Sequence, residues 1–469
     1  MSRLALLLIA SLAWAAGVSA AERTMPAGPF GTVTVYTPEG KPQAVVLFIS
    51  GDGGWQLGVV RMAQELVAKN AVVVGIDVRR YLASIARAQR SCRSLAGDFE
   101  NLSHAVQKQL QLNEYHVPVL IGYSSGATIV YATLAQGPPG TFTGGMSLGF
   151  CTDQDFKGAR LCPGTGLHYK RNSKGAYVLE PDPKLAPPWV ALQGQQDMVC
   201  PPAKVDRFVA AIPDASLVKL PKVGHGFGVE RNWLPQFLSA YEGISEHAPL
   251  APVASLQDLP LTEVPARAPS SRMALIMTGD GGWAGLDREI AARLAANSVS
   301  VVGLNSLEYF WRERSADQTT ADVARVLRHY LAEWHAERIL LIGYSFGAEV
   351  LPFVVNRLPD DLRGRIVGLY LLGPGTTASF EIHVADWIPG LTAEGVPIAP
   401  ELERLRGTPV LCIQGAAESD SLCAVRPAGR FTREVLGEGH HFSGDYAALV
   451  ARILAFAAAP HAAHPTTGS

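Results

Sequence analysis

Two stretches of the chain have nearly the same sequence, and this repetition constrains the fold more than any other feature. Residues 120–130 read LIGYSSGATIV and residues 341–351 read LIGYSFGAEVL. Aligned on these stretches, the two halves also match in the same order at 47–55 and 275–283, 73–81 and 301–309, 147–150 and 371–374, 191–200 and 412–423, and 223–227 and 438–442. An ordered series of matches indicates a duplicated domain. The 469 residues are enough for two domains of about 200 residues each.

Within each half, short apolar runs alternate with amphipathic segments. AVVLFIS at 44–50 and AVVVGID at 71–77 are nearly continuous apolar runs, which is typical of parallel strands buried on both faces. RMAQELVAKN at 61–70 and DREIAARLAANS at 287–298 have helical spacing of their apolar residues. Strands alternating with helices predict a mostly parallel sheet flanked by helices in each half.

The ends of the chain and its middle differ from the two repeats. Arg3 precedes an apolar run that ends in small residues, so 1–20 reads as a cleaved signal peptide, with an uncleaved anchor as the alternative. Residues 247–271 are rich in Pro and Ala and predict a linker. The expected domains are therefore 21–246 and 272–458, followed by a disordered tail at 459–469. We expect an exported, periplasmic protein.

Composition excludes several functional classes. The formal net charge of −2 gives no reason to expect a nucleic-acid partner. Neither a Cys-x-x-Cys motif nor a His-rich ligand spacing is present, so we expect no metal and no cofactor. Six cysteines suit an oxidising compartment. Cys412 and Cys423 flank one short segment and are candidates for a disulfide, whereas the pairing of the four cysteines in the first half is open.

Both repeated stretches contain the pattern Gly-x-Ser-x-Gly. The motif occupies 122–126 in the first half and 343–347 in the second. Its glycines permit a sharp turn from a strand into a helix, which exposes the serine hydroxyl at the edge of the sheet. We therefore predict that Ser124 and Ser345 are nucleophiles. The alternative is a purely structural turn.

A nucleophilic serine needs a base, and the base needs an acid that orients it. In the first half, Asp197 follows an apolar run and His225 comes later, in VGHGF; in the second half, His440 lies in the matching EGHHF. The chain order of serine, acid and histidine is the order found in α/β-hydrolases. The prediction is thus two tandem α/β-hydrolase-like domains, each with a catalytic triad.

The acid of the second triad is ambiguous. Counting back from Cys423 places Asp420 opposite Asp197, which precedes Cys200 by the same interval. Counting forward from Gly415 favours Glu418 instead. We prefer Asp420 and keep Glu418 as the second choice. His441 is a rival to His440 as the base.

The two GDGGW loops come early in their domains and follow apolar strands. In the hydrolase fold, such a loop supplies one backbone N–H to the oxyanion hole, and the residue after the serine supplies the other. The candidates for oxyanion or substrate binding are Gly51, Asp52, Gly53 and Ser125 in the first half, and Gly279, Asp280, Gly281 and Phe346 in the second. Trp55 and Trp283 are expected either to wall the pocket or to fill the core behind a tight turn. Glu349 is expected in solvent, or else beside Asp280 in the pocket, where the pair would favour a cationic group.

Taken together, the signal-like start, TGDGGW, GYSFGAEV, SDSLC and GHHF resemble the bacterial virulence proteins VirJ and AcvB. The two-domain layout is similar to AcvB, with the VirJ-like unit at 272–458. The resemblance implies a periplasmic α/β-hydrolase that cleaves the aminoacyl ester of lysyl- or alanyl-phosphatidylglycerol and restores the anionic lipid. It places the nucleophile at Ser345 and implies links to virulence and type IV secretion.

Two other functions compete with this one. The fold does not fix the substrate, so a general carboxylesterase, thioesterase or peptidase is one alternative. A non-catalytic protein that docks secretion-system components is another. The partner expected on the leading hypothesis is aminoacylated phospholipid at a membrane surface.

Overall fold

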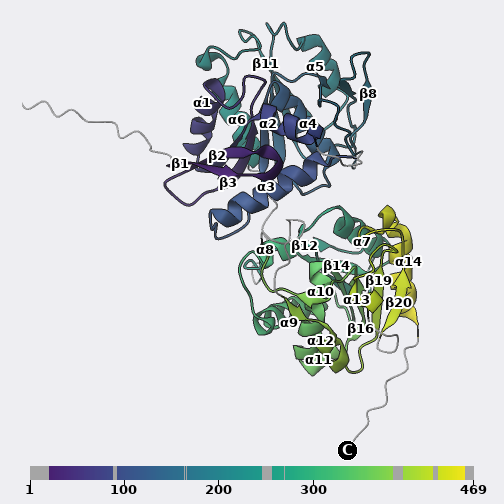
Figure 1. Ribbon diagram of the computed structural model, residues 1–469. Coiled ribbons are helices and arrows are strands. Elements are labelled where there is room, and N and C mark those ends of the chain that lie inside the picture. Colours follow the sequence, from purple (N-terminus) through teal and green to yellow (C-terminus); the bar gives the residue numbers. More distant parts are fainter. Residues whose placement is uncertain are drawn as a thin grey trace, which may run out of the picture.

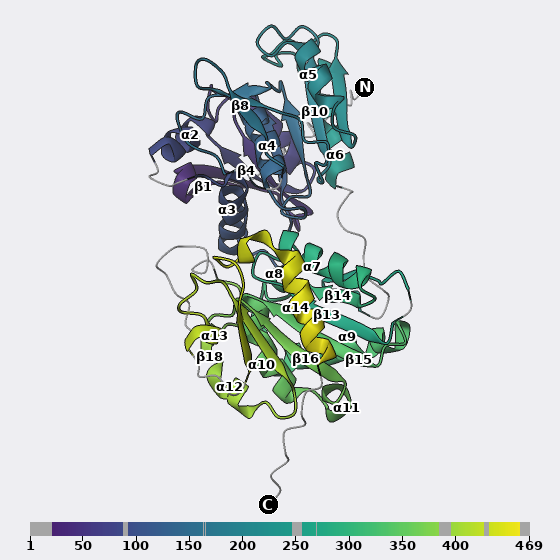
Figure 2. The same ribbon diagram turned by 90° about the vertical axis from the view of Figure 1, so that its right-hand side faces the viewer.

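The computed structural model describes residues 21–459 with the exception of 88–91, 163, 165, 246–255, 269, 384–394 and 426–430. The expected signal peptide at 1–20, part of the expected linker and nearly all of the expected tail lie outside the described residues. Two α/β domains follow one another along the chain, and both views show them as separate bodies (Figures 1 and 2). None of the described helices combines the length and the apolar character that crossing a bilayer requires.

Each domain is built on one large sheet. The first sheet comprises β1 (Ala21–Pro26), β2 (Thr32–Thr37), β3 (Ala44–Ile49), β4 (Ala71–Ile76), β5 (Val119–Tyr123), β6 (Gly144–Leu148), β10 (Trp189–Gly194) and β11 (Ala215–Leu220). The second comprises β12 (Leu261–Val264), β13 (Arg272–Met277), β14 (Ser300–Leu304), β15 (Arg338–Tyr344), β16 (Ile366–Leu372), β19 (Val410–Gln414) and β20 (Thr432–Val435).

The strand orders show that the duplication extends to topology. The first sheet runs β1-β2-β4-β3-β5-β6-β10-β11 and the second runs β12-β14-β13-β15-β16-β19-β20. Without β1, the two orders coincide. In both sheets the strands are parallel except at one edge, where β2 and β12 pair antiparallel with β4 and β14. The predicted fold class, two tandem mostly parallel α/β domains, is confirmed.

Helices cover both faces of each sheet, because alternate residues of a buried strand point to opposite sides. Val45 and Leu47 of β3 pack into one core cluster, while Val46 and Phe48 pack into the cluster on the other face. In the first domain the helices are α1 (Gly58–Val67), α2 (Val78–Arg87), α3 (Leu95–Gln109), α4 (Ser125–Gln136), α5 (Pro202–Val209) and α6 (Leu234–Ser245). In the second they are α7 (Gly285–Ala296), α8 (Ser306–Tyr309), α9 (Ala316–Glu333), α10 (Phe346–Arg357), α11 (Asp360–Arg363), α12 (Ala399–Arg404), α13 (Leu422–Val425) and α14 (Tyr446–Ala458).

Two smaller sheets decorate the domains. In the first domain, β7 (Asp153–Gln154), β8 (Tyr169–Arg171) and β9 (Tyr177–Leu179) pair in the order β7-β9-β8 within the segment between β6 and β10. In the second, β17 (Thr377–Ala378) pairs with β18 (Val396–Pro397).

The segment expected to be a linker differs from that expectation in its second part. β12 forms the antiparallel edge of the second sheet, and Leu256 and Leu259 are buried in the core of the second domain. The Pro-rich composition suggested a free connection, but a proline-flanked strand is compatible with a sheet edge, where one side needs no hydrogen-bond partner. The second domain therefore begins before residue 272.

Three disulfides join the six cysteines. Cys412 bonds to Cys423, as expected, and the first half contains Cys92–Cys162 and Cys151–Cys200. The second of these ties the loop after β6 to the loop after β10. Cys412–Cys423 ties β19 to the short helix α13.

The domains contact each other through the end of α3. Lys108 of α3 donates to the backbone oxygen of Trp311 and, at 3.1 Å, to the carboxylate of Glu381. Trp311 in turn donates from Nε1 to the backbone oxygen of Leu112 at 2.9 Å. Both views place α3 on the side of the first domain that faces the second (Figures 1 and 2).

Candidate active site

The two serines sit at sharp strand-to-helix turns with a strained backbone. Ser124 lies between β5 and α4 with φ 54°, and Ser345 lies between β15 and α10 with φ 50°. A positive φ is uncommon outside glycine and is found at functional turns. A Cβ at Gly126 would lie 2.3 Å from the backbone oxygen of Ile49, and one at Gly347 would lie 2.2 Å from that of Met277. Only glycine permits this approach, so the motif's glycines are required by packing.

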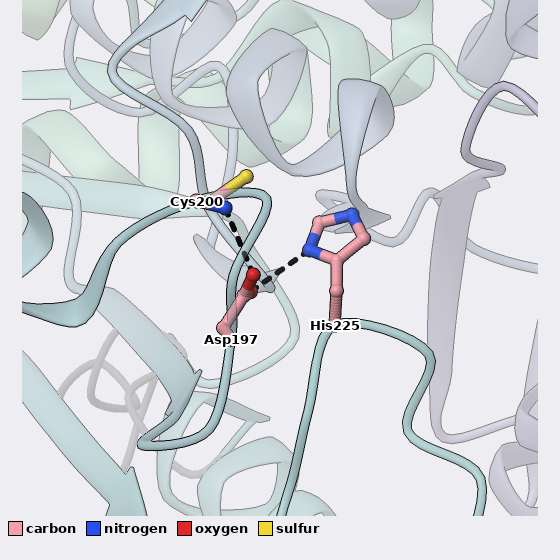
Figure 3. Close-up of side chains that lie close together, drawn as sticks. All are labelled: Asp197, Cys200 and His225. Carbon is pink, nitrogen blue, oxygen red and sulfur yellow. Dashed lines mark hydrogen bonds and ion pairs between the residues drawn. The ribbon is translucent and has the colours of Figure 1, made fainter.

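In the first domain, the structure brings the predicted serine, histidine and aspartate together. Ser124 Oγ lies 2.9 Å from His225 Nε2, and His225 Nδ1 lies 2.8 Å from Asp197 Oδ2. Figure 3 shows the bond between Asp197 and His225, which come from two different loops. The loops follow β10 and β11, so the carboxyl ends of parallel strands position them.

The carboxylate of Asp197 is held by further donors. It is 4% exposed and accepts hydrogen bonds from the backbone N–H groups of Val199 and Cys200, each at 2.8 Å. Gln193 Nε2 also donates to Oδ2, at 3.0 Å. These bonds fix the position of the carboxylate beside His225, as is required of an acid that orients a histidine.

The same part of the first domain has the spacing of a metal site, but its chemistry does not fit one. Ligand atoms of Asp197, Cys200 and His225 lie within 4.8 Å of one another. Cys200 is bonded to Cys151, so its sulfur is not a thiolate ligand. The His225 ring bonds the carboxylate through one nitrogen and the serine through the other. We therefore group Asp197 and His225 with Ser124, to which their hydrogen bonds connect them.

In the second domain, the corresponding series of hydrogen-bonded side chains contains a glutamate. Ser345 Oγ lies 2.9 Å from His440 Nε2, and His440 Nδ1 lies 2.6 Å from Glu418 Oε1. The other carboxylate oxygen, Oε2, accepts from the backbone N–H of Gly415 at 2.6 Å. Asp420 is exposed, so our preference for Asp420 is wrong and the second choice, Glu418, takes the position.

The position of the acid is set by the strand before it and not by the cysteine after it, which explains why Glu418 and not Asp420 bonds to His440. Gly194 ends β10, and Gly415 follows directly after the equivalent strand β19. In each domain the acid comes three residues after this glycine. Cys200 and Cys423 are not equivalent, because Cys200 pairs with Cys151 in another loop while Cys423 pairs with Cys412 on the strand itself. Counting from the cysteine therefore gave the wrong register.

The neighbouring histidine has a different contact. His441 Nδ1 lies 3.1 Å from the hydroxyl of Tyr344, and burial together with the adjacent His440 lowers the pKa of His441. It does not contact Ser345 in the structure as His440 does. The register that matches His440 with His225 therefore selects the residue beside the serine.

The GDGGW loops lie against the serines, as expected for oxyanion loops. A Cβ at Gly51 would lie 3.0 Å from Ser124 Cβ, and one at Gly279 would lie 3.4 Å from Ser345 Cβ. Phe346 is the first residue of α10, so its backbone N–H has no intrahelical acceptor. In the first domain the residue at the equivalent position, Ser125, donates from its hydroxyl to Asp52 Oδ1 at 2.8 Å.

Not every residue of these loops faces a pocket. A Cβ at Gly75 or Gly303 would collide with the ring of Trp55 or Trp283, so both tryptophans pack over their sheets and belong to the core. Gly53 accepts a hydrogen bond from Gln56 through its backbone oxygen. Glu349 accepts from the backbone N–H of Gly375 at 3.0 Å and so anchors the loop after β16.

A cavity of about 1140 Å³ opens at the second triad. Its walls include Ser345, His440 and the loop residues Gly279, Asp280 and Gly281. The volume exceeds the several hundred Å³ typical of small-molecule sites. It can therefore hold a substrate of some size beside the serine.

Sequence reasoning missed two glutamines that support the acids. Gln193 donates to the triad carboxylate of Asp197, and Gln414 Nε2 donates to the backbone oxygen of Glu418 at 3.0 Å. Both stand one residue before the glycine that precedes the acid loop. The repeated Gln-Gly pair in the two halves was a signal that could have identified them.

Comparison with known proteins places the chain in a family. The model of the family described as "Bacterial virulence protein (VirJ)" matches residues 43–143 and 271–459, which together make up more than half of the chain. No curated protein sequence matches significantly.

Several solved structures resemble about half of the chain each. A putative dienelactone hydrolase from Klebsiella pneumoniae is 13% identical with a TM-score of 0.36, and the match covers 49% of this chain and 99% of that protein. XC6422 from Xanthomonas campestris, described as an α/β serine hydrolase without a lid, is 19% identical with a TM-score of 0.32 and coverages of 50% and 98%. Esterase 2 of Thermogutta terrifontis is 15% identical with a TM-score of 0.34 and coverages of 50% and 97%. From the family match, this chain belongs to the VirJ family of bacterial virulence proteins.

Proposed function

We propose that the protein is a serine hydrolase that cleaves the aminoacyl ester of aminoacyl-phosphatidylglycerol, lysyl or alanyl, and restores the anionic lipid. The observation that carries the proposal is the hydrogen-bonded series Ser345–His440–Glu418 at the wall of a large cavity. A serine, a histidine and a carboxylate joined in this way form the arrangement that activates a serine for acyl transfer.

The geometry supports a two-step reaction. Ser345 Oγ attacks the carbonyl carbon of the aminoacyl ester while His440 Nε2 accepts the hydroxyl proton. The tetrahedral intermediate collapses, His440 gives the proton to the departing glycerol oxygen, and phosphatidylglycerol leaves. Water then attacks the aminoacyl-serine ester, with His440 again as base, and the free amino acid departs.

Two other groups have defined parts in this reaction. Glu418 holds the His440 ring with Nε2 toward the serine and stabilises the imidazolium that forms. We assign the oxyanion to the backbone N–H of Phe346, which begins α10, and to an N–H of the Gly279–Gly281 loop, which packs against Ser345. Removing a single donor of this kind typically costs about 10²–10³ in turnover.

The choice of substrate rests on the family resemblance together with the charge of the cavity. Asp280 and Asp287 line the cavity that contains Ser345, and an acidic wall suits the ammonium group of an aminoacyl ester. The second triad is proposed as the main site because the family match covers 271–459, which contains Ser345, Glu418 and His440. In the first domain it covers only 43–143, which excludes Asp197 and His225.

We further propose that the protein acts in the periplasm, at the membrane surface that holds its lipid substrate. The apolar segment that begins the chain supports export. Three disulfides among the described residues support an oxidising compartment. Association with secretion-system components is part of the same proposal and rests on the family resemblance alone.

Covalent labelling and product analysis test this function. The mature protein is treated with a fluorophosphonate, and peptides are mapped by mass spectrometry; labelling of Ser345 is expected because the probe reacts with activated serines. The protein is then incubated with lysyl-phosphatidylglycerol vesicles, where lysine and intact phosphatidylglycerol are the expected products. Release of fatty acid instead would indicate a general esterase. No labelling of either serine would favour a non-catalytic binding protein.

A further inference from the structure

The cavity at the second triad crosses the boundary between the domains. On the side of the second domain it is lined by Ser345, His440 and the GDGGW loop, and on the side of the first domain by Gly97 and Glu100 of α3 and by the loop at 137–139. The first domain therefore supplies part of the wall that faces the reacting serine. Neither domain alone encloses this space.

The loop of the first domain rests directly on the start of α7. A Cβ on Gly140, whose φ is +90°, would lie 2.5 Å from Arg288 Nη2 and 3.0 Å from the backbone oxygen of Trp283. A Cβ on Gly285 would lie 3.1 Å from Pro138 Cβ. Arg288 Nε donates to the same Trp283 oxygen at 3.2 Å. This contact sets the first domain against the end of the GDGGW loop.

Carboxylates from both domains meet in this cavity. Glu100 comes from the first domain and Asp280 from the second, and both line this cavity; burial, together with the charge of Asp280, raises the pKa of Glu100 to about 8. Like charges that meet in a partly dry site are unfavourable unless a cation lies between them. Two cationic side chains, Lys184 and Arg288, also line the cavity. The guanidinium of Arg288 donates a hydrogen bond to the backbone oxygen of Trp283.

A third carboxylate in the wall has an unused oxygen. Asp287 is 2% exposed, and burial raises the pKa of its carboxyl to about 7, although the nearby backbone N–H groups of Ala284 and Asp287 oppose the rise. Its Oδ1 has no hydrogen-bond partner among the described residues. A buried carboxylate oxygen without a donor costs free energy. Asp287 also lines the cavity, so this unpartnered oxygen adds to the negative potential that a cationic ligand meets there.

We propose that the first domain completes the substrate site of the second triad, and that Glu100, with Asp280 and Asp287, binds the cationic amino group of the acyl part of the substrate. The proposal rests on the proposed function and deepens it, because it assigns the recognition of the acyl group to residues of both domains. Glu100 is a positioning residue for substrate and takes no part in the proton transfers.

The test compares Glu100→Gln with the wild type in two assays. The first is calorimetric binding of lysinamide, which carries the amino groups without a cleavable ester. The second is hydrolysis of ethyl lysinate beside ethyl hexanoate, which has the same carbon chain without the amino groups. Glu39→Gln, an exposed glutamate outside the cavity, is the matched control.

We expect Glu100→Gln to weaken lysinamide binding about tenfold, the loss typical of one charge-assisted hydrogen bond. The kcat/KM for ethyl lysinate should fall by a similar factor through KM, while that for ethyl hexanoate stays within about twofold. Glu39→Gln should change neither. Undiminished lysinamide binding to Glu100→Gln, absent lysinamide binding to the wild type, or an equal loss on both esters would overturn the proposal.

The proposed function and the proposed cation site can be refuted independently of each other. Ser345→Ala should bind lysinamide like the wild type and hydrolyse both esters at least about 10³-fold more slowly. Binding that depends on Glu100, in a protein that cleaves neither lysyl-phosphatidylglycerol nor ethyl lysinate, would refute the proposed function and leave the cation site standing. Cleavage of the lipid with lysinamide binding unaffected by Glu100→Gln would do the reverse.

Discussion

Glu418 Oε1 lies 2.6 Å from Nδ1 of His440, where the first domain has an aspartate against its own histidine. The second oxygen of Glu418 accepts a hydrogen bond from the backbone N–H of Gly415, so both carboxylate oxygens are held in place. Asp420, two residues further along, is exposed. Substitution of Glu418 is therefore expected to lower turnover strongly, whereas substitution of Asp420 is expected to leave it nearly unchanged.

Glu418→Gln is expected to lower kcat by about 10³–10⁴, because an amide no longer holds His440 in the required tautomer or stabilises its charged form. Asp420→Asn is the matched control and should stay within about twofold of the wild type. Steady-state hydrolysis of a soluble ester measures both. A large loss in Asp420→Asn with normal turnover in Glu418→Gln would refute the assignment.

The disulfide of the second domain should matter to the acid loop in particular. Cys412 and Cys423 are separated by 11 residues, and Glu418 lies between them. The double change to alanine should cost about 2–3 kcal/mol of stability and lower turnover, because the loop that holds Glu418 is released. Chemical unfolding and ester hydrolysis report the two effects.

Cys151→Ala with Cys200→Ala is the control for that experiment. This disulfide lies in the first domain, and neither of its cysteines lines the cavity that contains Ser345. Its loss should lower stability while the kcat of the second triad changes little. If both double variants lost the same fraction of kcat, the disulfide at the acid loop would have no special part in positioning Glu418.

Buried carboxyls predict how stability depends on pH. Burial raises the pKa of Asp287 to about 7, and burial with Asp280 raises that of Glu100 to about 8. In an unfolded chain the pKa of such carboxyl groups is about 4. The folded protein thus holds more protons between these values, so this contribution is complete below about pH 4 and is lost as pH rises through the folded pKa values.

Melting temperatures at about pH 7.0 and 8.5 test this sign. In that window ordinary histidines are already largely neutral, so their titration contributes little. The wild type should melt at a lower temperature at pH 8.5, and Glu100→Gln should show a smaller decrease. Identical pH dependence in the two proteins would mean that Glu100 is ionised normally in the folded state.

Much of the fold could be predicted from the sequence because the same series of motifs occurs in both halves of the chain. The apolar runs marked the parallel strands, and the order of the matches was reproduced in the strand order of both sheets. The serine turns could be predicted because a Gly-x-Ser-x-Gly pattern after a strand allows few conformations. β12 was missed because an edge strand with one paired side has no continuous apolar pattern.

The site was predictable where local spacing decides it and not where tertiary contact does. His440 followed from its register with His225, whereas Glu418 was misjudged because a cysteine was taken as the reference point. The two disulfides of the first domain join loops that are distant in sequence, and spacing alone does not select them. The same holds for the meeting of Glu100 with Asp280, since it depends on how two domains pack.

Release of free amino acid from aminoacyl-phosphatidylglycerol vesicles, measured for the wild type beside Ser345→Ala and Ser124→Ala, is the most direct measurement of the central claim. The account predicts release that falls at least about 10³-fold in Ser345→Ala and changes little in Ser124→Ala. Full release by Ser345→Ala, or no release by a wild-type protein whose Ser345 still reacts with a fluorophosphonate, would contradict it.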